Sequence, residues 1–167
     1  MDLEASRRRA AVTAGYTGDI GTLRSLLEDR APKVRASALG GLARAGAITP
    51  ADLRAALADR SPHVRRRACE EAARTAAVDL VPALGDADPL VVEAACAALG
   101  ERTEADERTV DALCNVASAH PDALAREAAV AALGALGSWR GLPAILAATA
   151  DKPAVRRRAV LALAPFE

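Results

Sequence analysis

The chain has 167 residues, of which 51% are hydrophobic, 26% charged and 2% aromatic, and its formal net charge is zero. This composition excludes a disordered chain, and a neutral total charge is not the signature of a nucleic-acid-binding protein. No apolar run reaches the roughly 20 residues of a membrane span, and the acidic N-terminus lacks a secretory signal, so we expect a cytoplasmic protein without a membrane partner.

The predicted elements are helices, because a chain with so few aromatic residues must build its core from Ala, Leu and Val. We expect residues 3–14 to form the second helix of an incomplete first repeat, broken by Gly15 and Gly18. Asp19 can then cap the following helix. The next helix buries one apolar stripe and stops at Gly46.

The rest of the chain repeats a helix–turn–helix unit. Thr49-Pro50 supplies an N-cap residue followed by proline at the first helical position. In the third unit Pro82 lies inside the first helix, so we expect that helix to bend or to start later. The fourth unit is longer and has His120-Pro121-Asp122 at its turn. The predicted single domain consists of units at about 1–17, 18–47, 48–75, 76–102, 103–137 and 138–167.

One turn motif recurs, most clearly as Asp59-Arg60-Ser61-Pro62-His63-Val64-Arg65-Arg66-Arg67-Ala68-Cys69, with variants that begin at Asp29, Asp86 and Asp151. Equivalent positions are spaced by about 30 residues, which indicates a helical solenoid. The motif Asp–x–x–Pro–x–Val–Arg–x–x–Ala resembles that of the HEAT-repeat family, especially its short bacterial HEAT-like class of the PBS-lyase type. This resemblance implies an all-α, right-handed α-solenoid of about five helix-turn-helix repeats plus an N-terminal half-repeat.

The resemblance also implies a role for the motif residues, because in HEAT-like proteins the turn aspartate and the arginine of the second helix form a ladder between neighbouring repeats. An acidic side chain near a helix N-terminus suits the helix dipole, and the arginine fork can bridge carboxylates. Val92 in place of arginine and His120 near the aspartate position are expected to interrupt this ladder. The predicted ladder residues are Asp29, Asp59, Asp86 and Asp151 with Arg35, Arg65 and Arg156.

No motif for catalysis, for a cofactor or for a metal is found. The sequence has no nucleophile elbow, no HExxH and no glycine-rich phosphate loop, so we expect no enzyme activity. Cys69 and Cys96 occupy an apolar column and are expected in the core, and Cys114 is expected to be reduced, since no CxxC spacing occurs. His63 and His120 are expected to be exposed, ordinary histidines.

Helical periodicity defines a ridge on the outer side of the second helices, which the resemblance places on the concave face. The first half of this ridge is basic, and the second half is small and apolar. The predicted partner-binding residues are Arg8, Arg9, Tyr16, Lys33, Arg44, His63, Arg66, Arg67, Arg74, Leu90, Ala94, Ala97, Ala128, Ala131 and Arg158.

We therefore expect a non-catalytic scaffold or adaptor that binds an acidic or amphipathic segment of a protein partner. Two alternatives stay open. A DNA-binding or other nucleic-acid-binding HEAT-like protein would show salt-dependent binding, and a component of a bilin-lyase-type enzyme would change the absorbance of a bilin. The apolar residues Val160, Leu161 and Leu163 also need a cover. Either Phe166 folds over this end, or the end packs against another copy and forms a homo-oligomer.

Overall fold

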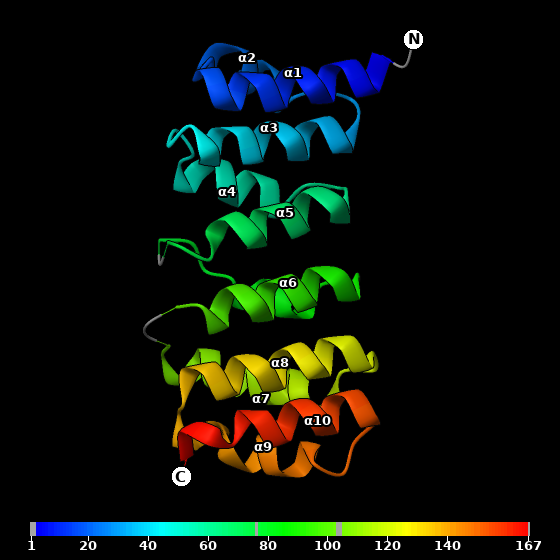
Figure 1. Cartoon of the computed structure of the whole chain (residues 1–167), viewed down its shortest axis with the longest axis vertical. Helices are drawn as coiled ribbons and strands as arrows, with labels where there is room; N and C mark the ends of the chain where they lie inside the picture. Colours follow the sequence, from blue (N-terminus) through cyan, green and yellow to red (C-terminus); the bar gives the residue numbers. More distant parts are fainter. Residues whose placement is uncertain (1–2, 76, 103–104, 167) are drawn as a thin grey trace. The chain divides into compact units, whose positions relative to one another are not determined.

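The computed structural model describes residues 3–75, 77–102 and 105–166. Within these residues the chain is all-α, as predicted, with ten α-helices and three short 3-10 helices. Consecutive helices pack as pairs (Figure 1). The chain forms two compact units, Met1–Glu71 and Ala72–Glu167, and each is described by itself.

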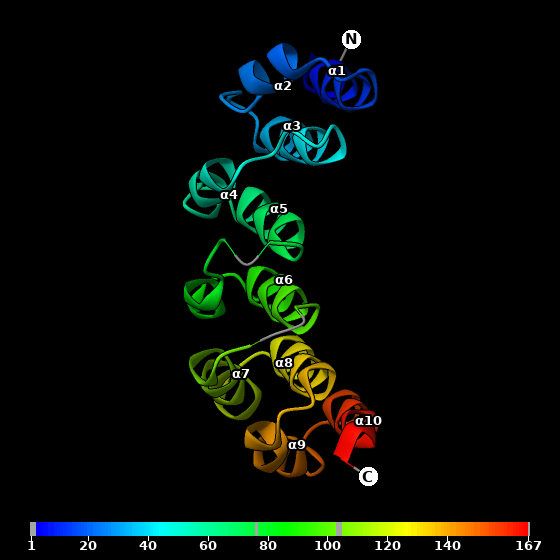
Figure 2. The ribbon, with the colours of Figure 1, turned by 90° about the vertical axis from the view of Figure 1, so that its left-hand side faces the viewer.

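The first unit holds the early repeats. Figure 2 shows its second helices, α1, α3 and α5, along one side and its first helices, α2 and α4, along the other. Helix α5 ends just past the boundary of the unit. The elements are α1 (Leu3–Thr17), α2 (Ile20–Leu26), α3 (Pro32–Arg44), α4 (Pro50–Leu57) and α5 (Pro62–Ala72).

The second unit is arranged in the same way, with α6, α8 and α10 as second helices and α7 and α9 as first helices (Figure 2). The elements are η1 (Val81–Gly85), α6 (Pro89–Gly100), α7 (Glu107–Ala119), α8 (Ala123–Leu136), η2 (Trp139–Gly141), α9 (Leu142–Ala148), α10 (Pro153–Ala162) and η3 (Ala164–Phe166).

The predicted helix caps of the first unit are confirmed. The side chain of Asp19 accepts a hydrogen bond from the amide of Thr22 at 3.0 Å. Thr49 and Asp52 form a reciprocal capping box at the start of α4, which satisfies backbone N–H groups that the helix cannot satisfy itself. Gly46 ends the preceding helix with a φ of 68°, in the left-handed region that favours glycine.

The prediction that Gly15 breaks the first helix is wrong, because α1 continues through this residue to Thr17. Gly15 is needed for packing. A Cβ atom at this position would lie 2.8 Å from the Cα of Gly41 in α3. Glycine therefore allows the backbones of α1 and α3 to approach closely, and the helix ends only before Gly18, whose φ is 73°.

The third repeat has a 3-10 helix in place of its first α-helix. Element η1 spans Val81–Gly85 and contains Pro82. Because proline has no backbone N–H and fixes φ, it suits the start of a helical turn and not the interior of a longer helix. The prediction that Pro82 would disturb this helix is confirmed, and the α-helix expected there is replaced by a single short turn.

The core consists of small and aliphatic side chains. In the first unit Leu23, Ala38 and Leu42 pack together between α1, α2 and α3, and a second cluster joins Leu39 to Val64. Many of the buried residues are alanines, whose side chains fill little space. The helices therefore reach a high packing density through close approach of their backbones.

A half-buried arginine that the sequence analysis did not single out supports the start of the second unit. The Nη2 atom of Arg102 donates to the backbone oxygens of Ala72, Thr75 and Val78 at 3.3, 3.0 and 2.8 Å. Burial lowers the pKa of Arg102, and the charge of Asp79 opposes this effect. Arg102 thus supplies donors to carbonyl groups where the chain has no regular helix.

The C-terminal residues pack back onto the last repeat. The ring of Phe166 lies edge-to-face against Trp139, with centroids 5.3 Å apart. This contact agrees with one of the two expectations for the C-terminal repeat, namely that Phe166 folds back onto it. It leaves Val160 60% and Leu161 67% exposed, so packing of this end against another copy stays a prediction.

Candidate functional site

The turn motif builds a ladder of ion pairs in which Arg7, Arg35 and Arg126 each reach the aspartate of the following repeat. Arg7 Nε lies 2.6 Å from Asp29 Oδ2, and Arg35 Nη2 lies 2.6 Å from Asp59 Oδ1. Arg35 also donates from Nη1 to the backbone oxygen of Asp29 at 2.8 Å. One guanidinium therefore holds its own turn and the next turn together.

The same pairing occurs in the second unit with a residue that the predicted ladder omitted. Arg126 Nε lies 2.7 Å from Asp151 Oδ2, so Asp151 pairs with Arg126 and not with Arg156. Arg156 is exposed and makes no ion pair within the described residues. Val92, which replaces the arginine in the third repeat, is fully buried. The signal for Arg126 was present in the sequence, since it aligns with the other ladder arginines.

Two further ladder residues make local contacts. Arg65 donates from Nη1 to the backbone oxygen of Asp59 at 2.9 Å, as Arg35 does in its own repeat. Asp86 accepts a hydrogen bond from the amide of Asp88 at 2.9 Å. Both residues thus stabilise the turns to which they belong.

The ladder perturbs the carboxylates that take part in it. Burial alone would raise the pKa of Asp59, but the hydrogen bonds from Arg35 and from the Ser61 amide outweigh burial and lower it. The hydrogen bond from Arg126 lowers the pKa of Asp151 to about 2, helped by the amide of Lys152. These directions indicate a structural role, because they keep the carboxylates ionised and paired.

A second set of ion pairs links neighbouring repeats through the first helices and the loops before them. Arg24 pairs with Asp52, Arg108 with Asp79 at 3.0 Å, and Arg140 with Asp111 at 2.5 Å. The paired residues are 28 or 29 positions apart, close to the repeat length. This spacing was the signal that could have revealed the pairs from the sequence.

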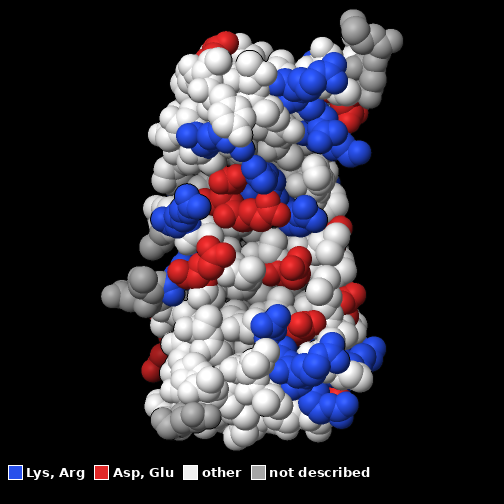
Figure 3. Space-filling view, viewed as in Figure 1, with Lys and Arg blue, Asp and Glu red and all other residues white. Residues whose placement is uncertain are grey.

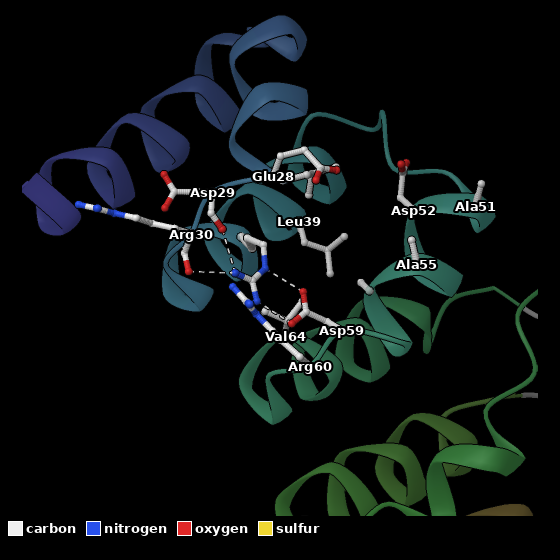
Figure 4. Close-up of a pocket in the computed structure, with 13 residues that line it drawn as sticks. Glu28, Asp29, Arg30, Leu39, Ala51, Asp52, Ala55, Asp59, Arg60 and Val64 are labelled. Carbon is white, nitrogen blue, oxygen red and sulfur yellow. Dashed lines mark hydrogen bonds and ion pairs between the residues drawn. The ribbon is translucent and has the colours of Figure 1, made fainter.

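A pocket of about 580 Å³ opens at the turn side of the first unit, between the ends of α2 and α4 (Figure 4). Most of the charged side chains that line the pocket already form ion pairs, because Arg35, Asp29 and Asp59 belong to the ladder and Asp52 pairs with Arg24. Its apolar lining includes Leu39, which is fully buried. The pocket is therefore a by-product of the ladder and offers few groups to a ligand.

The basic half of the predicted ridge is exposed in the first unit. Arg8, Arg9, Lys33 and His63 are exposed, and Arg66 is half-buried. Within the described residues Arg8, Arg9 and Lys33 make no ion pair, and Arg66 Nε lies 3.2 Å from Glu70 Oε1. Arg8, Arg9 and Lys33 thus carry the uncompensated positive charge of this group, whereas the charge of Arg66 is balanced by Glu70.

Arg67 differs from its neighbours because it folds over α3. A Cβ atom at Gly40 would lie 2.1 Å from Arg67 Nη2, so the arginine covers that glycine. Arg67 forms ion pairs with two glutamates, since its Nε lies 2.9 Å from Glu71 Oε1 and its Nη1 lies 3.2 Å from Glu70 Oε2. The N–H group at Nε does not point at an acceptor, so it makes no hydrogen bond within the described residues. The partner-binding role predicted for Arg67 is not supported by this placement, because its charge is already neutralised.

Other ridge residues vary in their accessibility. Tyr16 is exposed and lies under the guanidinium of Arg44, whose Cζ is 4.6 Å from the ring centroid. Arg74 and Leu90 are also exposed. Ala94 corrects the prediction, since it is only 7% exposed. Ala94 lies on the packed side of α6, whereas Glu93 and Ala97 of the same helix are at least partly exposed to solvent.

The apolar half of the ridge forms a groove of about 320 Å³ across α6, α8 and α10. We call it the alanine groove. Its floor consists of small residues, and its rim carries three glutamates, one leucine and one arginine. The lining residues are Ala97, Gly100, Ala128, Ala131, Ala132 and Ala135 on the floor, and Glu93, Glu101, Leu124, Glu127 and Arg158 on the rim.

The rim of the alanine groove is acidic. Arg158 Nη2 lies 3.5 Å from Glu127 Oε1, so this pair is neutral overall. Glu93 and Glu101 make no ion pair within the described residues. Leu124 is 42% exposed beside them. The groove thus combines an apolar floor with unneutralised carboxylates.

The cysteines and histidines of the described residues show no sign of a reactive site. Cys69 and Cys96 are fully buried, and burial together with Asp111 raises the pKa of Cys114. The Nδ1 atom of His120, which is half-buried and not exposed as predicted, accepts from the amide of Asp122 at 3.1 Å. In the described part of the chain no three metal-ligating side chains gather, and no helix is both long and apolar enough to cross a bilayer.

Sequence comparison assigns the chain to a family of repeat proteins. The family model for HEAT repeats matches residues 50–134 and 77–164, which together span more than half of the chain. The chain therefore belongs to the HEAT-repeat family. A search of curated protein sequences finds no match.

Comparison with solved structures shows the same fold in proteins of low sequence identity. An engineered protein matches with a TM-score of 0.69 and 18% identity, over 100% of this chain and 94% of its own. A designed armadillo repeat protein in complex with the peptide (KR)4 matches with a TM-score of 0.66 and 19% identity, over 98% and 91%. Human deoxyhypusine hydroxylase in complex with glycerol matches with a TM-score of 0.57 and 21% identity, over 99% and 80%.

Proposed function

We propose that this protein is a non-catalytic scaffold that binds an amphipathic segment of a partner protein in the alanine groove. The observation that carries the proposal is the groove itself, an apolar hollow of about 320 Å³ with an acidic rim. A segment that places apolar side chains on the floor and lysine or arginine near Glu93 and Glu101 would match both features.

The packing of the second helices supports this proposal. Gly100 and Ala132 let α6 and α8 approach until a Cβ at Gly100 would be 2.9 Å from the Ala132 Cα. Small side chains at Ala128 and Ala131 then leave room above the helices. The designed armadillo repeat protein of similar fold was solved with the peptide (KR)4, a ligand that is as basic as the proposed segment.

Binding of a defined amphipathic peptide tests the proposal. The probe is a fluorescent leucine–lysine peptide that forms an amphipathic helix, and a scrambled peptide of equal composition is the control. Ala131→Arg fills the groove and adds positive charge, so we expect it to weaken binding at least about tenfold, since it loses both fit and complementarity. Ala147→Arg changes an exposed alanine of α9 outside the groove and should leave the affinity within about twofold.

Two results would contradict the proposal. One is equal affinity for the amphipathic and the scrambled peptide, which would indicate non-specific attraction. The other is equal loss of binding in Ala131→Arg and Ala147→Arg, provided that circular dichroism shows both variants to be folded.

A further inference from the structure

Positively charged side chains gather on the second-helix face of the first unit. We call this the basic surface and define it as Arg8 and Arg9 of α1, Lys33 of α3, and His63 and Arg66 of α5. Figure 3 shows lysine and arginine side chains clustered over the ends of α1 and α3 that lie at the right of the view. No carboxylate among the described residues pairs with Arg8, Arg9 or Lys33.

The charges of this surface act on one another. Burial lowers the pKa of His63, and the positive charges of Arg66, Lys33 and Arg8 lower it further, against the opposing effect of Glu70. The lowered pKa of His63 thus records the positive potential of this surface, to which Arg8 of α1 and Lys33 of α3 contribute. Lys33 and His63 stand next to Pro32 and Pro62, the first residues of α3 and α5, where the helix dipoles add to the positive potential.

A hollow of about 400 Å³ lies between α1 and α3 beside these charges. Arg8 and Arg9 form one wall, together with Val12 and Thr13, and Ser37 forms the other. The hydroxyl of Ser37 donates to the backbone oxygen of Lys33 at 2.8 Å, so its hydrogen is already used within α3. Carboxylate groups can enter this hollow and meet guanidinium groups in the bidentate geometry that arginine favours.

The distribution of the cations favours an extended acidic chain over a single phosphate group. The cations do not converge on one point, because they come from three neighbouring helices whose axes are about 8–10 Å apart. An extended chain of the polyproline II type has three residues per turn and advances about 3.1 Å per residue, so side chains three residues apart lie on one side of it and match that spacing. Nucleic acid fits less well, because Glu70, which pairs with Arg66 of the basic surface, would face a continuous row of phosphates, whereas an acidic segment can place an uncharged residue opposite it.

We propose that the basic surface binds a protein segment rich in aspartate and glutamate, with carboxylates about three residues apart. This inference rests on the proposed scaffold function and adds a second site with the opposite charge preference. The two sites lie in different units of the chain, so each can be tested by itself.

The test measures the affinity for a fluorescent peptide of repeated Asp-Gly-Ser triplets, and a peptide of the same composition with its aspartates in one block is the control. We expect the double variant Arg8→Gln, Lys33→Gln to weaken binding of the triplet peptide at least about tenfold. The double variant Arg30→Gln, Arg60→Gln removes the same charge from exposed residues that line the turn-side pocket. It should change the affinity by no more than about twofold.

Equal losses in the two double variants would overturn the proposal, since they would show a response to net charge alone. Tighter binding of a single-stranded oligonucleotide of equal charge would also overturn it and assign the surface to nucleic acid. The leucine–lysine peptide separates this proposal from the previous one. If that peptide still binds while the triplet peptide does not, only the acidic-segment site is disproved. If both peptides fail, the scaffold function fails with it.

Discussion

At the scale of single residues, the same motif position has different consequences in different repeats. Arg126 and Arg156 are equivalent in the sequence, but only Arg126 has the aspartate of a following repeat within reach, at 2.7 Å. Its Nη1 atom also donates to the backbone oxygens of His120 and Pro121 at 2.8 and 3.1 Å. The contribution of a ladder arginine to stability therefore depends on its neighbour and not on the motif.

Substitution of these two arginines tests that dependence. We expect Arg126→Gln to lower the free energy of unfolding by about 1–3 kcal/mol, because it leaves Asp151 and two backbone oxygens without their donor. Arg156→Gln should cost less than about 0.5 kcal/mol, because its exposed side chain forms no ion pair in the part of the chain that the structure describes. Urea denaturation followed by the fluorescence of the single tryptophan, Trp139, reports on the unit that holds both arginines. Equal effects of the two substitutions would contradict this account.

The sequence predicted the placement of small core residues but not that of long charged side chains. Periodicity alone identified the fully buried Cys69 and Cys96, because burial follows from the position on a helix. The fate of a long side chain does not follow from its position. Arg67 was predicted on the ridge but bends over Gly40, and Arg102 turns inward to three carbonyl groups. Such choices depend on nearby space and acceptors, which only the folded chain defines.

At the scale of helices, glycine sets how closely the second helices approach. A Cβ at Gly15 would be 2.8 Å from Gly41, one at Gly100 would be 2.9 Å from Ala132, and one at Gly134 would be 2.6 Å from Ala162. Real Cβ atoms do not tolerate such distances. The sequence indicated that glycines end helices, which is right for Gly46 and wrong for Gly15, since composition does not show whether a glycine serves a turn or a contact.

Gly134→Ala tests the role of close approach. Helix propensity alone predicts that this substitution stabilises α8 by up to about 1 kcal/mol. We expect the opposite, a loss of about 1–3 kcal/mol, because the new methyl group would overlap Ala162 and push α8 and α10 apart.

Gly85→Ala is the matched control for this substitution, since no atom lies within 4 Å of a Cβ at Gly85 and its φ is not positive. This substitution should be neutral or slightly stabilising. Tryptophan fluorescence during urea denaturation measures both variants. A stabilising effect of Gly134→Ala would show that the contact is loose enough to accept a side chain.

At the scale of the whole molecule, repetition made the fold predictable. The all-α architecture follows from a motif that recurs at helical spacing, and the family assignment agrees with it. The chain divides into two compact units between Glu71 and Ala72, and the single repeat domain expected from the sequence stays a prediction. The second unit opens with η1 in place of an α-helix.

The carboxylates of the ladder make the whole molecule sensitive to acid. Burial would raise the pKa values of Asp29 and Asp59, but hydrogen bonds from arginines and backbone amides outweigh burial and lower them. The pKa of Asp52, which pairs with Arg24 outside the ladder, is lowered against burial in the same way. The pKa of Asp151 falls from 3.8 to about 2. A carboxyl group whose pKa is lower in the folded state contributes stability above its unfolded pKa and loses that contribution as the pH falls through the folded value. Stability should therefore fall between about pH 4 and about pH 2.

The substitution Asp151→Asn measures how much of the stability lost at low pH comes from this one carboxylate. The variant should be less stable than the native chain at pH 5, where Asp151 is ionised and paired with Arg126. The difference should shrink by on the order of 2 kcal/mol as the pH falls to about 2, because protonation removes the same charge from the native carboxyl group. Urea denaturation followed by tryptophan fluorescence, at pH values from 5 to about 2, measures both proteins. A constant difference across this range would mean that Asp151 titrates at its ordinary pKa and that the ladder does not hold it ionised.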